Sequence, residues 1–265
     1  MPAMLEFSLQ LEKPLHVPLY TGDIVRGIFL HIVRKIDPAL SFKLHEEQTP
    51  KPYATTPLYF KSKGKFAKGY VVDHTYPVSF TIKLLTDDLV ERILENIPEC
   101  FHLTIISTSA YVMNIGFDSI SYDELIDAEP KERFRIVFKT PTYFSQLGSK
   151  YHSLYPDPIK LFTNLFTLWN LYSSNDLYRD INSDDLVLWL RKNVGIVEHT
   201  LRTVYVETRE RKLVGFKGWA TYEAPLGDEM NKIIQTLSRF GEYSNVGGYR
   251  TAGFGVMHYI PKQET

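Results

Sequence analysis

Hydrophobic and polar residues alternate strictly near the start of the chain, over residues 5–11. This period of two predicts a β-strand with one buried face. Residues 24–36 change to the helical period, with apolar side chains three or four positions apart. Asp37 and Pro38 follow, and we expect them to end this helix. The polar, proline-containing stretch 41–57 then indicates a loop.

The same two periods divide the rest of the chain into short elements. In the first half we expect strands at residues 58–60, 70–72 and 78–85, a helix at 87–97 and a strand at 101–107. In the second half we expect strands at 133–140, 203–207, 214–223 and 256–260, and helices at 158–172, 183–193 and 228–240.

Both halves therefore repeat the order strand, helix, two strands, helix, strand, although no residue-level repeat is visible. This order predicts an α+β protein made of two tandem ferredoxin-like, RRM-like β-α-β-β-α-β domains. We expect an N-terminal domain at residues 1–128 and a C-terminal domain at residues 129–265, meeting near residues 128–132. The open sheet of such a domain is a common platform for RNA.

The composition agrees with an ordinary globular protein. Of 265 residues, 44% are hydrophobic and 23% are charged, and no apolar run has the length of a membrane span. The first residues lack the pattern of a signal peptide, and Cys100 is the single cysteine. No disulfide framework or cysteine-based zinc site can form, so we expect a cytoplasmic protein without a membrane partner.

The formal net charge of −1 does not announce a nucleic-acid partner, but the charges are unevenly placed. Residues 51–72 hold five lysines and no acid, and residues 190–218 hold seven basic residues against three glutamates. A solvated surface explains either stretch alone. Two basic stretches in a nearly neutral protein favour a polyanionic ligand.

Residues 247–255, GGYRTAGFG, contain four closely spaced glycines. They lie between an expected helix and the last expected strand, which is the reverse of the order in dinucleotide-binding and P-loop motifs. Two interpretations remain open. The glycines form a tight turn, or they present bare backbone to a polyanion.

Several stretches resemble the CRISPR repeat-processing endoribonucleases of the RAMP superfamily. The most specific is the closing block FGEYSNVGGYRTAGFGVMHY, which resembles the glycine-rich signature of that family. The runs GFKGWATY, FKTPTYF, PDPIKLFTNLFTLWN and YTGDIVRGIFLHIV, and the LH and KPY of the following loop, extend the resemblance over nearly the whole chain. RAMP subunits that do not cut RNA share the fold and the glycines.

The resemblance implies a metal-independent endoribonuclease that cuts precursor CRISPR RNA within its repeats. A ribose 2′-OH attacks its own 3′ phosphate and leaves a 2′,3′-cyclic phosphate and a 5′-OH. This chemistry needs a base, an acid and a cation, and no cofactor or metal. The implied partner is CRISPR repeat RNA, with other interference subunits and the choice between monomer and homodimer left open.

The resemblance also points to individual catalytic residues. His45 matches the histidine of the active-site loop, and imidazole can act as acid or base near neutral pH. Lys51 matches a lysine that some members use near the scissile phosphate. Several members carry a catalytic tyrosine where this chain has Leu30, so His31 is the candidate second base, with Tyr20 and Tyr53 as weaker substitutes.

For RNA binding, the resemblance places the glycine-rich backbone against the RNA and leaves the Arg250 side chain free to meet phosphate. The expected RNA-binding residues are Gly247, Gly248, Arg250, Thr251, Gly253 and Gly255, with Arg26, Arg202, Arg209 and Lys217 as secondary contacts.

Two other functions remain open. The first is a RAMP subunit that binds CRISPR RNA in an interference complex without cutting it, and the second is a ferredoxin-like enzyme of small-molecule metabolism. Incubation with labelled repeat RNA in EDTA separates cleavage, binding alone and neither.

Overall fold

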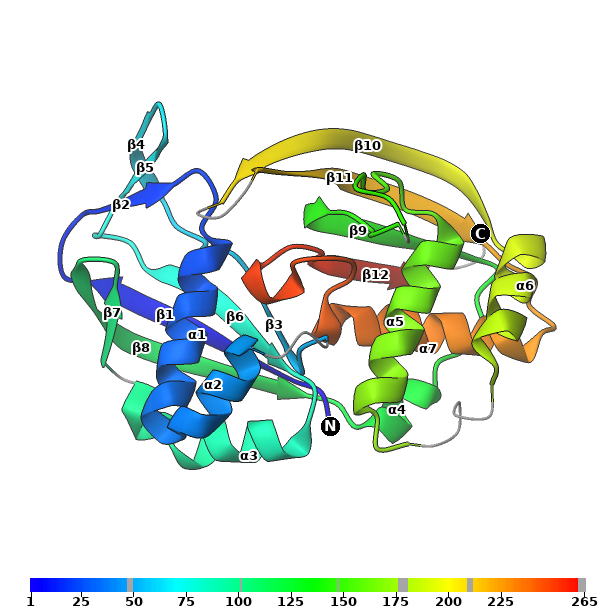
Figure 1. Cartoon of the computed structure of the whole chain (residues 1–265), viewed down its shortest axis with the longest axis horizontal. Helices are drawn as coiled ribbons and strands as arrows, with labels where there is room; N and C mark the ends of the chain where they lie inside the picture. The colour runs from blue at the N-terminus through cyan, green and yellow to red at the C-terminus, as the bar shows by residue number, and fades with distance from the viewer. Residues whose placement is uncertain (47–49, 101, 147, 176–180, 209–211, 262–265) are drawn as a thin grey trace.

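The fold comes from a computed structural model, which describes residues 1–46, 50–100, 102–146, 148–175, 181–208 and 212–261. Figure 1 shows the two halves of the chain side by side, each with its own sheet and helices. Among the described residues, none of the helices combines the length and the apolarity that crossing a membrane requires.

The first half is built on a five-stranded antiparallel sheet with the order β3-β6-β1-β8-β7. Its strands are β1 (Ala3–Leu11), β3 (Tyr53–Thr55), β6 (Val78–Leu84), β7 (His102–Ile105) and β8 (Thr108–Ser119). The helices α1 (Gly22–Ile36), α2 (Pro38–Glu46) and α3 (Asp87–Glu95) belong to this half (Figure 1). The alternation predicted for β1 is confirmed, because Leu5, Phe7 and Leu9 are fully buried against apolar residues of α1.

Several elements of this half differ from the sequence prediction, and β3, for example, lies in the predicted loop 41–57. The stretch that begins at Pro38 is a helix rather than a loop, because proline fits the first turn of a helix, where its missing N–H needs no partner. The strand beside β1 is β8, which the pattern did not predict, whereas the predicted strand forms the edge strand β7. Four of the strands then give the ferredoxin-like order β3-β6-β1-β8.

A second, smaller sheet of the first half has the order β2-β5-β4. Its strands are β2 (Leu15–Pro18), β4 (Ser62–Phe66) and β5 (Gly69–Val72). Figure 1 shows it projecting from the body of the molecule, at the upper left.

The second half follows the predicted element order closely. Its antiparallel sheet has the order β10-β11-β9-β12, from β9 (Arg133–Thr142), β10 (Gly195–Glu207), β11 (Lys212–Glu223) and β12 (Met257–Pro261). Its helices are α5 (Pro158–Tyr172), α6 (Ser183–Asn193) and α7 (Glu229–Ser244). Phe134, Phe162 and Trp169 lie in one core cluster between these strands and helices. The predicted pair of ferredoxin-like units is confirmed.

A short segment links the two sheets and contains α4 (Tyr122–Ile126). Ser121 begins this helix with a capping box, in which its hydroxyl accepts from the Glu124 N–H and the Glu124 carboxylate accepts from the Ser121 N–H. Tyr122 and Leu125 pack in the core of the second half. A domain boundary at residue 128 stays a prediction.

Candidate active site and nucleic-acid interface

An open cleft of about 560 Å³ lies between α1 and α2. Helix α1 contributes Gly27, Leu30, His31 and Arg34, and helix α2 contributes Pro38, Ser41, Phe42 and His45. On each helix, most of these residues are three or four positions apart. The cleft residues of each helix therefore lie on one face of that helix. The structure thus brings together the two histidines predicted as catalytic residues.

Local bonds fix how the two helices meet. The Asp37 carboxylate accepts a hydrogen bond from the Leu40 N–H at 3.0 Å, which satisfies a donor in the first turn of α2. The Ser41 hydroxyl donates to the Leu30 carbonyl oxygen of α1, also at 3.0 Å. Leu44 packs into the core, while His45 on the same helix is exposed. These bonds hold the cleft-lining face of α2 towards α1.

The cleft holds groups suited to proton transfer near a phosphate. His45 Nδ1 lies 2.9 Å from a Glu46 carboxylate oxygen, a contact that orients the ring. His31 and Arg34 are exposed on the neighbouring helix face. Two imidazoles can serve as base and acid, and a guanidinium can offset negative charge on a phosphorane. Arg34 was missed from the sequence, although its spacing of three residues from His31 on a helix could have identified it.

The other catalytic candidates are placed differently. Leu30, at the position of the family tyrosine, lines the cleft but cannot carry a proton. Tyr53 is 1% exposed, and burial raises the pKa of its hydroxyl. Tyr20 donates to the Ala252 carbonyl oxygen at 2.9 Å and lies outside the cleft lining. Lys51 also lies outside it, and its carbonyl oxygen accepts a hydrogen bond from Arg250 at 3.0 Å.

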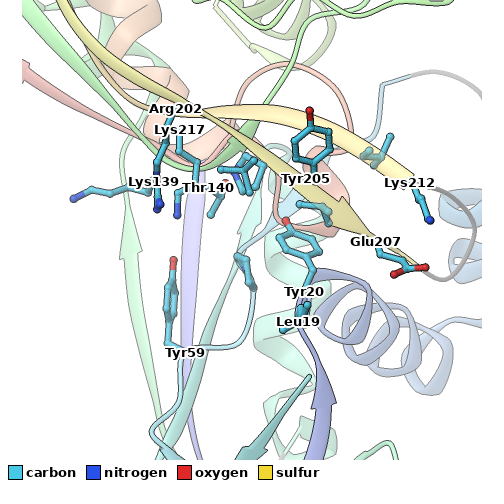
Figure 2. Close-up of a pocket in the computed structure, with 15 residues that line it drawn as sticks. Leu19, Tyr20, Tyr59, Lys139, Thr140, Arg202, Tyr205, Glu207, Lys212 and Lys217 are labelled. Atoms are coloured by element: carbon cyan, nitrogen blue, oxygen red, sulfur yellow. The ribbon is translucent and has the colours of Figure 1, made fainter. Parts of the chain in front are cut away.

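A second hollow, the basic groove, has a volume of about 650 Å³ and lies between the two halves (Figure 2). One wall comes from the segments around Tyr20 and Tyr59 in the first half. The other wall comes from β9, β10 and β11. Among the described residues of its lining, the charged ones are Lys139, Arg202, Lys212, Lys217 and a single acid, Glu207.

Like charges face each other across two strands of this groove. Arg202 on β10 pairs directly with Lys217 on β11, and Figure 2 shows the two side chains together. Partial burial and the neighbouring Arg202 both lower the pKa of Lys217. Like charges directly opposite each other destabilise a sheet. A bound phosphate would relieve this repulsion.

Exposed aromatic rings accompany these charges. Tyr205 on β10 is 82% exposed and Tyr59 is 49% exposed. Figure 2 shows Tyr59 on the wall opposite Arg202 and Lys217, with its hydroxyl towards them. Basic side chains beside exposed aromatic rings are typical of surfaces that bind single-stranded RNA. Arg202 and Lys217 were predicted from the sequence, whereas the two tyrosines were not.

The N–H groups of the four glycines in the glycine-rich segment all bond within the protein, although Gly247 and Gly248 line a small open hollow beside Lys160. The N–H of Gly248 donates to the Tyr143 carbonyl oxygen and the N–H of Gly255 donates to the Pro141 carbonyl oxygen, each at 3.0 Å. The N–H groups of Gly247 and Gly253 also have acceptors within the protein, which are Asn164 Oδ1 and the Arg250 carbonyl oxygen. The interpretation as bare N–H groups is therefore wrong, whereas contact between RNA and the rest of this backbone stays a prediction.

Steric demand explains why glycine is needed there. Gly253 and Gly255 have φ values of +80° and +68°, in the left-handed region. A Cβ on Gly253 would lie 2.8 Å from the Pro57 nitrogen, and a Cβ on Gly255 would lie 1.7 Å from the Val246 carbonyl oxygen. The glycines allow close approach by the protein's own backbone, as in the tight-turn interpretation.

Arg250 is 6% exposed, so the prediction that its side chain is free to meet phosphate is also wrong. Its guanidinium donates to the carbonyl oxygens of Ser244 at 2.5 Å and Lys51 at 3.0 Å. Burial lowers its pKa to about 10. Nearby, the buried Lys83 ammonium donates to the Glu242 carbonyl oxygen, and burial lowers its pKa to about 8. Both cations bond carbonyls in the last turn of α7, where the helix dipole is negative.

The segment around Arg250 joins the two halves. Tyr249 donates to an Asp23 carboxylate oxygen at 2.7 Å, and the Thr55 hydroxyl donates to the Thr251 carbonyl oxygen at 2.9 Å. We call residues 245–255 with these partners the joint. Thr251 thus contacts the first half through its backbone.

Two of the predicted secondary RNA contacts, Arg26 and Arg209, remain to be described. Arg26 is half-buried on α1, and its guanidinium hydrogen bonds to Tyr53, away from both hollows. Arg209 lies outside the described residues.

Comparison with protein families assigns both halves of the chain. A family model for the CRISPR Cas6 N-terminal domain matches residues 1–97. A second, for the CRISPR-associated endoribonuclease Cas6, matches residues 136–257. The two matches together span well over half of the sequence.

Individual relatives support the same family assignment. The CRISPR-associated endoribonuclease Cas6 of Streptococcus thermophilus is 24% identical over 217 residues, which are 80% of this chain and 81% of the relative. Among solved structures, a Cas6 product complex matches with a TM-score of 0.78 and 24% identity, covering 98% of this chain and 100% of the other. Thermus thermophilus Cas6 matches with a TM-score of 0.73 and 22% identity, covering 98% of both chains. These structures share the tandem ferredoxin-like fold.

Proposed function

Because the chain belongs to the family of the CRISPR-associated endoribonuclease Cas6, we propose that it cuts precursor CRISPR RNA within its repeats by metal-independent transesterification. One observation carries the proposal. Two histidines from different helices, His31 and His45, line one open cleft together with Arg34. Solved relatives include complexes with a product and with a substrate mimic.

The proposed reaction uses these three side chains. One imidazole accepts the proton of a ribose 2′-OH while its oxygen attacks the adjacent phosphorus. The bond from phosphorus to the 5′-oxygen breaks, and the other imidazole gives that oxygen a proton. The products are a 2′,3′-cyclic phosphate and a 5′-OH. The Arg34 guanidinium offsets the charge that develops on the phosphorane.

We assign RNA binding to the basic groove. Its four cations and exposed tyrosines suit a single strand of RNA, and phosphate contacts supply most of the affinity. Helix α1 connects the two hollows, since it begins two residues after Tyr20 in the groove wall. His31 lies nine residues further along, a helical rise of about 14 Å. An RNA strand can therefore lie in the groove and reach the cleft along α1.

Single-turnover cleavage of labelled repeat RNA in EDTA tests the reaction. His45→Ala and His31→Ala should each slow cleavage roughly 10²- to 10⁴-fold, the usual effect of removing a positioned acid or base. RNA affinity should change little, because neither side chain lies in the groove. His258→Ala is the matched control, since this exposed histidine lies on β12 outside the cleft.

Four outcomes would contradict the proposal. A His45→Ala protein that cuts at the wild-type rate removes the catalytic assignment. A wild-type protein that needs Mg²⁺, or that yields no cyclic phosphate, removes the mechanism. Binding without cleavage would show a subunit that holds CRISPR RNA without cutting it.

A further inference from the structure

The small projecting sheet carries a cluster of lysines that the groove does not use. We call residues 61–68, which comprise β4 and the turn that leads to β5, the lysine hairpin. All five residues of β4 are exposed, and β4 is an edge strand with β5 as its one neighbour in this sheet. The cluster consists of Lys61, Lys63, Lys65 and Lys68. All four side chains are exposed.

The positive charge of the hairpin is largely uncompensated. Its sequence holds no acidic residue, and Lys63 forms an ion pair with Asp73 at 3.2 Å. Lys61 lies over the ring of Tyr76, with its nitrogen 3.7 Å from the ring centroid. Phe66, on β4 itself, is 41% exposed. Lysines on an edge strand also prevent strands of other molecules from pairing with it, but exposed aromatic rings work against that protection.

Basic and aromatic side chains together favour single-stranded nucleic acid, because phosphates bind the cations and bases stack on the rings. An acidic protein would use the charges without needing the rings. The chemistry of the hairpin therefore favours RNA.

The hairpin continues the basic groove. Strand β2 runs into Leu19 and Tyr20, which line the groove, and Lys61 follows the groove residue Tyr59 by two positions. From Tyr59 to Lys65 an extended chain covers about 20 Å at ~3.3 Å per residue. An RNA strand that leaves the groove on this side meets the hairpin next.

We propose that the lysine hairpin is a second RNA-binding surface, which holds the phosphates of RNA flanking the repeat. Lysine contacts with phosphate carry no sequence information, which suits a flank of variable sequence. The inference rests on the proposed function, because it requires repeat RNA in the groove.

Salt-dependent binding to two RNAs tests it. The first is the repeat alone, and the second is the repeat extended at either end by an arbitrary single-stranded sequence. Each carries a 2′-deoxyribose at the mapped cut to prevent cleavage. The test variant replaces Lys63, Lys65 and Lys68 by Gln. The control replaces Arg191, Lys192 and Lys232 by Gln, which removes the same charge from α6 and α7 at the other end of the molecule (Figure 1).

For the extended RNA, we expect the slope of log K against log salt to fall by about 2 in magnitude, since each lost contact with a single strand contributes ~0.7. The affinity at 0.1 M salt should fall about 10- to 100-fold on the same basis. Binding of the repeat alone should be unchanged, and the control should keep the wild-type slope for both RNAs.

Other results would overturn the inference. If the test variant binds the extended RNA with the wild-type slope, the hairpin does not contact the flank and edge protection explains its lysines. If the repeat alone is weakened equally, the hairpin belongs to the repeat-binding site. Failure of the proposed function would be seen in a different experiment. The wild-type protein would then not cut unmodified repeat RNA, whether or not the hairpin binds RNA.

Discussion

Replacing Gly255 by alanine should destabilise the joint far more than the same change at Gly148. The two glycines share a left-handed backbone, with φ of +68° and +71°. A Cβ at Gly148 meets nothing within 4 Å, whereas a Cβ at Gly255 would lie 1.7 Å from the Val246 carbonyl oxygen. Comparing the two substitutions therefore separates the free-energy cost of the left-handed backbone from the cost of the clash between the new Cβ and the Val246 carbonyl oxygen.

The magnitudes follow from these surroundings. The left-handed conformation costs an alanine about 1 to 2 kcal/mol, and the less flexible unfolded chain returns about 0.4 to 1 kcal/mol. Gly148→Ala should thus cost about 1 kcal/mol. At Gly255 the backbone must also move, which strains two hydrogen bonds of 3.0 Å, to the Val246 N–H and to the Pro141 carbonyl oxygen. At about 1 kcal/mol each, the total is about 3 kcal/mol or more.

Thermal unfolding followed by circular dichroism measures the difference. At about 2 to 4 °C per kcal/mol for a protein of this size, Gly255→Ala should lower Tm by about 6 to 12 °C and Gly148→Ala by less than about 4 °C. RNA affinity of folded Gly255→Ala should match that of the wild type. Equal Tm shifts would show that the collision is relieved without cost. Normal stability with lost RNA affinity would instead support a direct contact between this segment and RNA.

Further predictions concern the interior and the groove. Burial lowers the pKa of Lys83 to about 8. Above that pH the unfolded protein therefore binds more protons than the folded protein, and the free energy of unfolding rises with pH. From pH 8 to 9.5 it should rise by about 2 kcal/mol, at ~1.4 kcal/mol per pH unit. Urea unfolding should show no such rise for Lys83→Met, and an equal rise in this variant would contradict the assignment. Tyr205→Ala should weaken RNA binding by about 1 to 3 kcal/mol, as for a lost stacking partner. Tyr151→Ala, at a 69% exposed position outside the groove, should have no effect, and equal losses would show that the effect of Tyr205→Ala is not specific to the groove.

Much of the fold could be predicted because its elements have strong periods. The predicted helix at 158–172 agrees with α5 in both of its ends, and the basic strand at 133–140 lies within β9. The helix α2 was missed because Pro38 resembles a stop, although proline is also favourable in a first turn. Strand β8 was missed because its burial does not alternate over its whole length.

The candidate site was predicted in part. His31 and His45 line one cleft, while their catalytic roles stay predictions; Arg34 could have been proposed from its spacing to His31, but that His45 lies in the same cleft depends on how the two helices face each other. For the glycine-rich segment the sequence left two interpretations open, and the structure shows the close backbone approach of a tight turn. In a sequence, a glycine looks the same whether the group that approaches it is a phosphate or a carbonyl of its own chain, such as that of Val246.

The joint has a consequence for the synthesis of the protein. The bonds from Tyr249 to Asp23 and from Arg250 to Lys51 span 226 and 199 residues of sequence. Contacts between such distant residues form late in folding, because a long loop must first close. A nascent chain exposes His45 and the candidate cation Lys51 long before Arg250 has been translated. The hydrogen bond from Arg250 to the Lys51 carbonyl therefore forms only when the last part of the chain is made, which ties the geometry of this part of the first half to completion of the whole molecule.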